Sequence, residues 1–256
     1  MYAGFNLDMN DDFVRFKQTG NTIYNVQMQK VKDGISKFIL DDGSINGSDM
    51  QNSWFPQIHA DVFISHSHND KEKAIAFAGW LKHTFNLDAF IDSSVWGSAD
   101  ELLKKIDDRY CKNTDSSTYS YEKRNFSTSH VHTMLSAALM MVIDQTECMF
   151  FLNTPETINA LSVINSTKSP WIYYEIGVSK FLRKREPNRP KGIIKKGMFE
   201  NAQDLTIQYK LDMDHLYDIN QSHLLDWQRL FTLHNENHPL DLLYGMKKML
   251  LENSMS

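Results

Sequence analysis

One segment in the second half of the chain places a carboxylate beside aromatic rings. Within residues 171–177 (WIYYEIG), Trp171 and Glu175 are four residues apart and Tyr174 is three from Trp171. Side chains at these spacings share one face of a helix. Two rings there would desolvate the carboxylate and offer surfaces on which a planar ring can stack. The alternative is structural, because aromatic residues at helical spacing commonly fill a core.

A second segment, residues 65–70 (SHSHND), carries possible metal ligands. His66, His68 and Asp70 stand at alternate positions, and zinc and iron sites use histidines spaced in this way with a carboxylate. The spacing resembles the start of the HxHxDH signature of metallo-β-lactamase-type hydrolases. However, Lys71 takes the place of the last histidine, and its ammonium group would repel a cation. The alternative is a polar loop whose Asp70 lies at the positive end of a helix.

Two further segments stand out. Residues 92–101 (DSSVWGSADE) are mostly small and contain one tryptophan, Trp96, which is typical of a mobile lid or a contact loop. The alternative is an ordinary loop whose last two acidic residues favour the start of the next helix. The basic tract from Lys180 to Lys196 suits the solvated end of a helix better than a phosphate or nucleic-acid site.

The elements that must position these residues alternate between strand and helix. Short β-branched and aromatic runs predict strands, amphipathic or apolar stretches predict helices, and Ser169-Pro170 is a favourable helix start. Such an alternation indicates a parallel sheet covered on both faces, with ligands at the carboxyl ends of its strands. Functional residues should therefore follow Ile64, Ile91 and Leu152. The predicted strands are 60–65, 87–92 and 148–152, with weaker ones at 193–194 and 205–209, and the predicted helices are 70–85, 131–143, one from 170, 224–233 and 240–251.

The predicted domain boundary lies near His59. Residues 1–20 are polar, residues 22–40 have helical spacing and residues 43–57 are rich in turn formers. We therefore expect residues 1–58 to form an N-terminal helical extension and linker, and residues 59–256 to form the main domain. The polar stretch 107–129 is too long for a routine connection and is expected to be an insertion.

Composition narrows the class of protein. The chain has 256 residues and a formal net charge of −5, which disfavours a general nucleic-acid coat. We expect no membrane span and no secretory signal. Only Cys111 and Cys148 occur, as suits a reducing cytoplasm.

Together, these segments resemble the TIR (Toll/interleukin-1 receptor) domain family over residues 59–185, and beyond them only in element order. The resemblance rests on four segments. Asp61–Ser67 with Asp70 look like the family's opening FISHS…D box, and Phe90–Asp92 resemble its second strand and the loop that follows. Cys148–Asn153 resemble its third strand, and Ser169–Ile176 resemble its S-x-W-x-x-x-E-[LI] segment.

This resemblance implies a flavodoxin-like α/β sandwich of about five parallel strands. It further implies that Glu175 is the catalytic carboxylate that cleaves the nicotinamide–ribose bond of NAD, which is the substrate and not a cofactor, and that no metal takes part. Ser65 and His66 would line the same cleft. Trp171 and Tyr174 would pack against the ribose or a base ring, and Asp92 and Trp96 would belong to the loop that opens or closes it.

Stand-alone chains of this kind resemble the Thoeris-type antiphage enzymes of bacteria, which turn NAD into an ADP-ribose-derived signal for a nucleotide-sensing effector protein. The resemblance thus implies a cytoplasmic enzyme that self-associates through residues 92–101 and needs neither a membrane nor a specific nucleic acid. Two alternatives remain open. One is a non-enzymatic TIR interaction module, although residues 92–101 lack the Arg-Asp…Pro-Gly pattern of receptor and adaptor domains. The other is a metal-dependent hydrolase that uses His66, His68 and Asp70.

Overall fold

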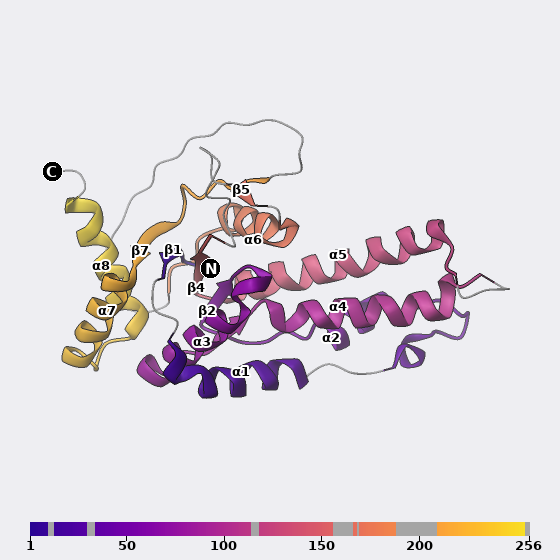
Figure 1. The fold of residues 1–256 in the computed structure, drawn as a ribbon, viewed down its shortest axis with the longest axis horizontal. Coiled ribbons are helices and arrows are strands. Elements are labelled where there is room, and N and C mark those ends of the chain that lie inside the picture. Colours follow the sequence, from indigo (N-terminus) through magenta and orange to yellow (C-terminus); the bar gives the residue numbers. More distant parts are fainter. Residues whose placement is uncertain are drawn as a thin grey trace.

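A computed structural model shows an α/β fold built on one parallel sheet (Figure 1). The structure describes residues 1–9, 13–29, 34–113, 118–155, 166–167, 169–187 and 209–253. The sheet has five strands, all parallel, in the order β3-β2-β4-β1-β7, which confirms the predicted fold class. The strands are β1 (Ala3–Asp8), β2 (Val62–Ser65), β3 (Ala89–Ile91), β4 (Cys148–Asn153) and β7 (Tyr217–Asn220).

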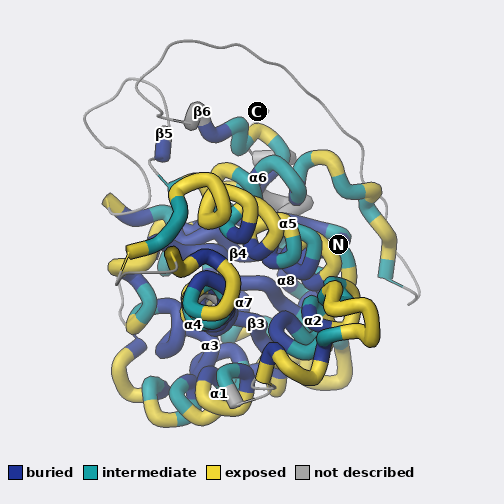
Figure 2. The backbone as a smooth tube through the Cα atoms, turned by 90° about the vertical axis from the view of Figure 1, so that its right-hand side faces the viewer, coloured by how far each residue is buried: buried dark blue, intermediate teal, exposed yellow. Residues whose placement is uncertain are grey.

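Helices cover both faces of this sheet, and buried strands run between helices whose outer sides are exposed (Figure 2). One face carries α1 (Lys17–Gln29), α3 (Lys71–Phe85), α7 (Gln221–Leu233) and α8 (Pro239–Asn253). The other carries α2 (Gly47–Trp54), α4 (Ser93–Ile106), α5 (Tyr121–Gln145) and α6 (Pro170–Phe181). Short elements complete the described chain: η1 (Val14–Phe16), η2 (Ile35–Phe38), η3 (His68–Asp70), η4 (Asp107–Cys111), β5 (Ser166–Thr167) and β6 (Tyr209–Lys210).

The strands divide their side chains between two apolar cores. In β2, Val62 and Ile64 face the core under α3, whereas Phe63 faces the core under α5. In β4, Phe150 and Phe151 divide in the same way. Successive side chains of a strand point to opposite faces, so a strand covered on both sides reads as a continuous apolar run. That run is why the sequence predicted β2, β3 and β4 close to their observed positions.

The N-terminal residues are part of the sheet, which corrects two expectations. Strand β1 lies between β4 and β7, with Ala3 opposite Cys148 and Phe5 opposite Tyr217. Residues 1–58 are therefore not an extension outside the main fold, and the domain boundary expected near His59 would separate β1 from its neighbours in the sheet. Strands β3, β2 and β4 follow the order 2-1-3 of flavodoxin-like sheets, but the N-terminal strand occupies the fourth position.

Helix α1 packs closely on α3 through two glycines. A Cβ atom on Gly20 would lie 1.8 Å from the carbonyl oxygen of Ile75, and one on Gly79 would lie 2.1 Å from that of Phe16. This contact ties the N-terminal segment to the first helix after β2. The predicted helix over 22–40 is wrong in its bounds, because α1 covers Lys17–Gln29, and α2 forms within the predicted linker.

The segments between β3 and β4 also differ from expectation. Residues 92–101 are not a loop but mostly the first turns of α4, and the expected insertion 107–129 comprises η4, a short connection and the start of α5. Among the described helices, only α5 is long and apolar enough to cross a membrane. Its apolar residues Val131, Leu135 and Leu139 are buried in the core, so it packs here as a core helix.

Candidate functional site

Buried polar side chains gather at the carboxyl ends of β2, β3 and β4. Ser65 ends β2 and His66 follows it, Asp92 follows β3, and Thr154 follows β4. Strand order reverses around β2, because β3 lies on one side of it and β4 on the other. In open parallel sheets this reversal opens a crevice at the carboxyl edge, where ligands bind.

Glu175 joins these residues from the second turn of α6. Ser169 caps that helix, since its Oγ accepts a hydrogen bond from the backbone N–H of Ile172, and Pro170 occupies the first turn. The side chain of Glu175 is 0% exposed. Ser65 Oγ donates a hydrogen bond of 2.6 Å to Glu175 Oε2, which links the end of β2 to α6.

Asp92 and Glu175 form a pair of buried carboxyl groups. The two carboxyl groups are close enough to influence each other's ionisation, and Asp92 is also 0% exposed. Burial raises the pKa of Glu175 well above its usual range, and the neighbouring charge of Asp92 raises it further. Burial likewise raises the pKa of Asp92, against the opposite effects of Glu175 and of the hydrogen bond from the Ser93 backbone N–H. The pair therefore holds a proton at a pH where exposed carboxyl groups are ionised.

His66 completes the cluster as a neutral imidazole. Its Nδ1 lies 2.6 Å from Asp92 Oδ1, and its ring is fully buried. Burial lowers the pKa of His66 to about 4, against the smaller opposite effect of Glu175. The contact with Asp92 is thus that of a dipole with a carboxyl group, not an ion pair. At neutral pH, His66 carries no positive charge that could cancel the negative charge of the carboxyl pair.

Asp70 joins the loops after β2 and β4. Its Oδ2 accepts hydrogen bonds from Ser67 Oγ at 2.8 Å and from Thr154 Oγ1 at 2.5 Å, and Lys73 Nζ lies 3.2 Å from its Oδ1. Asp70 is buried, so these contacts hold the loops that follow β2 and β4 in a fixed relation.

The structure brings together four of the seven residues predicted for the site: Ser65, His66, Asp92 and Glu175. Trp171 and Tyr174 instead face α5. The Trp171 ring packs edge-on against His132, and the Tyr174 hydroxyl donates to the Ser136 carbonyl oxygen. The expectation that both rings flank the carboxylate is wrong, because the helix turns its carboxylate toward the sheet and these rings toward α5. Trp96 belongs to α4, and its side chain lies outside the described part of the structure.

The predicted metal ligands do not converge. His66 contacts Asp92, His68 is exposed, and Asp70 is held by Ser67 and Thr154. Within the described residues, a different set of side chains brings its possible metal-ligating atoms within 4.8 Å of one another: Glu147, His238 and Asp241. A metal centre on His66, His68 and Asp70 is therefore not supported.

The basic tract is partly neutralised. Lys180 pairs with Asp212, and Arg185 Nη2 lies 2.5 Å from Asp144 Oδ2. Residues 188–196 of this tract, and the strand predicted at 193–194, lie outside the described residues. Of the strand predicted at 205–209, the structure describes only Tyr209, which begins β6.

The sequence reasoning missed Thr154 and the partners of the predicted residues. The rule that polar residues after a parallel strand face the crevice also applies to Thr154, two residues after Leu152. The contact between His66 and Asp92 carried no sequence signal, because it joins residues after two different strands. Likewise, the hydrogen bond from Ser65 to Glu175 joins residues that are 110 positions apart in the sequence.

The chain was also compared with known proteins. No family model matches it, and neither the curated proteins nor the solved structures give a significant match.

Proposed function

We propose that this protein is a TIR-like NAD glycohydrolase or cyclase in which Glu175 is the catalytic carboxylate. The observation that carries the proposal is the pair of fully buried carboxyl groups of Asp92 and Glu175, which lie at the carboxyl edge of the sheet where strand order reverses. Ser65 and His66 contact this pair from β2 and would help to shape the substrate site. The TIR assignment itself rests on the sequence motifs.

Charge complementarity supports NAD as the substrate. Two carboxyl groups that retain one proton carry one negative charge, and nicotinamide in NAD carries one positive charge. Coulomb attraction is strong in a desolvated site, so the pair favours a cationic ring over a neutral one. A cation beside Glu175 also lowers its pKa, which returns the carboxylate to its charged form when the substrate is present.

The reaction places its developing charge where this carboxylate acts. The bond between ribose C1′ and the nicotinamide nitrogen breaks, and its electron pair goes to the nitrogen, so nicotinamide leaves as a neutral molecule. Positive charge then develops on C1′ and the ring oxygen, where a nearby carboxylate stabilises it. Water attacks C1′ and releases a proton to give ADP-ribose. Attack by another nucleophile would give a cyclic or conjugated product.

Full burial of Glu175 implies that substrate entry requires movement of the crevice walls. We propose that self-association through residues 92–101 favours the open arrangement, because Asp92 caps the helix that these residues begin. Gly97 and Asp100 are exposed on that helix and are available to a second copy. We also propose that the product is an antiphage signal made in the cytoplasm for a nucleotide-sensing effector.

The test is incubation of the full chain with NAD and mass spectrometry of the products over a range of protein concentrations. Wild type should release nicotinamide. Glu175→Gln preserves the shape of the side chain and should lower turnover by roughly 100-fold or more. Glu72→Gln is a matched control, because Glu72 lies on the surface and pairs with Lys17. It should leave turnover unchanged, and undiminished nicotinamide release by Glu175→Gln would refute the assignment.

The second candidate function is a non-enzymatic interaction module. The 0% exposure of both Asp92 and Glu175 favours it, since a closed carboxyl pair can serve the fold alone. It predicts no nicotinamide release by wild type at any concentration or during phage infection. It also predicts a loss of self-association in Asp100→Lys, while Glu175→Gln associates normally.

A further inference from the structure

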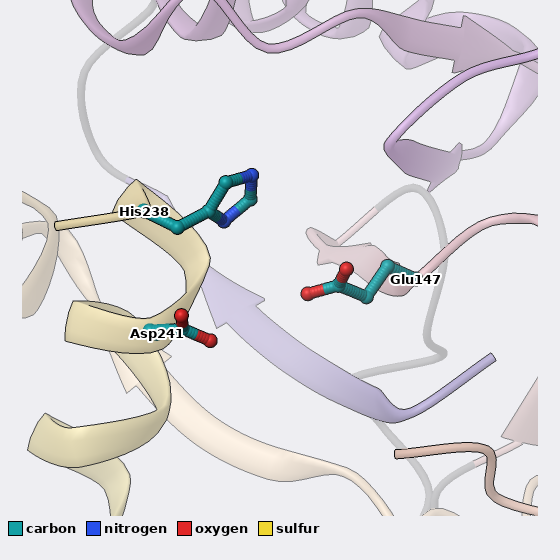
Figure 3. Close-up of side chains that lie close together, drawn as sticks. All are labelled: Glu147, His238 and Asp241. Carbon is teal, nitrogen blue, oxygen red and sulfur yellow. The ribbon is translucent and has the colours of Figure 1, made fainter. Parts of the chain in front are cut away.

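Three possible metal ligands converge at the edge of the sheet opposite the carboxyl pair. Glu147 immediately precedes β4, His238 precedes α8, and Asp241 lies in the first turn of α8. One ligand atom from each lies within 4.8 Å of the other two. Figure 3 shows the His238 ring and both carboxylates facing one common space, with Glu147 opposite His238 and Asp241.

His238 provides an independent observation. Its Nδ1 atom is buried and makes no hydrogen bond within the described structure. A buried ring nitrogen without a partner loses its hydration without compensation, which costs free energy. A metal ion would satisfy this atom, because the lone pair of a neutral imidazole nitrogen is a metal ligand.

Glu147 and Asp241 bring two acidic side chains to the space that the His238 ring faces. Two negative charges this close repel each other. The amino end of α8 offsets part of the charge of Asp241. A divalent cation placed between both carboxylates offsets the charge of each and replaces their repulsion with attraction.

We infer that Glu147, His238 and Asp241 form a binding site for a divalent transition metal, with zinc as the favoured ion. One imidazole nitrogen with two carboxylate oxygens is a zinc-type ligand set, whereas calcium and magnesium prefer oxygen ligands alone. Zinc bonds are about 2.0–2.2 Å long, so the ligand atoms must close by about an ångström through side-chain rotation. Water would complete a tetrahedral shell.

The site would fasten the C-terminal helix to the sheet. Glu147 is already linked to α8 and to the residue before β1. Its Oε1 accepts a hydrogen bond from the hydroxyl of Tyr244 in α8, and its carbonyl oxygen accepts one from the backbone N–H of Tyr2. Leu240, Leu243 and Tyr244 of α8 are buried in the core on the same side. The metal would join this helix directly to the start of β4. The inference does not depend on the proposed function, because the site is separate from the carboxyl pair.

The experiment is calorimetric titration of the chelator-treated full chain with zinc chloride. Wild type should bind one zinc ion per chain. Glu147→Gln, Asp241→Asn and His238→Gln should each weaken binding by roughly tenfold or more. Glu147→Gln retains an acceptor for Tyr244, so it tests ligation without removing that hydrogen bond. The matched control is His234→Gln combined with Glu236→Gln, an exposed pair with 3.7 Å between His234 Nδ1 and Glu236 Oε1.

Two further measurements test the coordination geometry and the proposed metal link between α8 and the start of β4. Cobalt in place of zinc should give the visible absorption of a four-coordinate ion in wild type, and His238→Gln should abolish it. Zinc should also slow hydrogen exchange over residues 239–246 in wild type but not in His238→Gln. Absence of stoichiometric binding, undiminished binding by the ligand variants, equal loss in the control, or equal affinity for calcium would each overturn the inference.

Discussion

Asp92 and Glu175 bring two fully buried carboxyl groups together in the interior of the protein, although one follows β3 and the other lies on α6. A protein that buries two carboxyl groups together gives up stability whenever both would otherwise be ionised. This cost is typical of sites that are organised for chemistry. The pair therefore leads to predictions about both stability and turnover.

Glu175→Gln should stabilise the fold at neutral and alkaline pH. The pKa of Glu175 is raised in the folded chain, so that chain binds more protons than the unfolded one, and wild type loses stability as the pH rises toward the folded pKa. The variant has no such proton to lose, so its advantage should grow by about 1 kcal/mol per pH unit over this range. Denaturant unfolding at several pH values measures it. An advantage that shrinks as the pH rises would contradict the shared-proton pair.

Ser65→Ala should shift the pH dependence of nicotinamide release. The hydrogen bond from Ser65 lowers the pKa of Glu175, so its removal leaves a carboxyl group that ionises at higher pH. The acidic limb of kcat/KM should move to higher pH, and kcat/KM at neutral pH should fall by roughly tenfold or more. Ser44→Ala is a surface control, because the Ser44 hydroxyl donates within its own exposed turn, to Asp42. If the acidic limb of kcat/KM stays at the same pH in Ser65→Ala, Ser65 does not act on the pKa of the group that controls turnover.

Acid should destabilise the protein through two histidines, the buried His66 and the partly buried His215. Burial lowers the pKa of His66 and of His215 to about 4, below the value of 6.5 for an exposed histidine. The unfolded chain therefore binds protons first. The stability contributed by the neutral rings is complete above pH 6.5 and is lost as the pH falls toward 4. Each group should contribute about 1 kcal/mol per pH unit at most. His66→Gln and His215→Gln should each flatten the pH dependence of the melting temperature.

The contact between α1 and α3 should not tolerate a methyl group. Gly20→Ala and Gly79→Ala would each push a Cβ into a backbone carbonyl, and should destabilise the protein by roughly 1–3 kcal/mol. Gly177→Ala is the matched control, because Gly177 is also helical and nothing lies within 4 Å of its Cβ position. That change should stabilise the protein by about 1 kcal/mol through helix propensity. Equal effects on all three variants in denaturant unfolding would contradict the close approach.

Local patterns were enough to predict the central elements but not the elements at the margins. Strands β2, β3 and β4 are short apolar runs with clear boundaries, and Ser169-Pro170 marked the start of α6. Strand β1 was missed because Asn6 and Asp8 alternate with its apolar residues and make the segment look polar. Helix α4 was missed because small residues and Gly97 obscure its apolar positions Val95, Ala99, Leu102 and Ile106, which are spaced as one helical face.

The sequence alone determined that Ser65, His66 and Asp92 would lie at the same edge of the sheet, because polar residues that follow parallel strands share that edge. Only the tertiary structure decided which face of α6 points inward. Helical spacing groups Trp171 with Glu175, but packing against α5 takes Trp171 and Tyr174 in one direction and leaves Glu175 against Ser65 and Asp92. Spacing fixes which residues share a face, whereas the neighbours available for burial decide where that face points, and these neighbours come from distant parts of the chain.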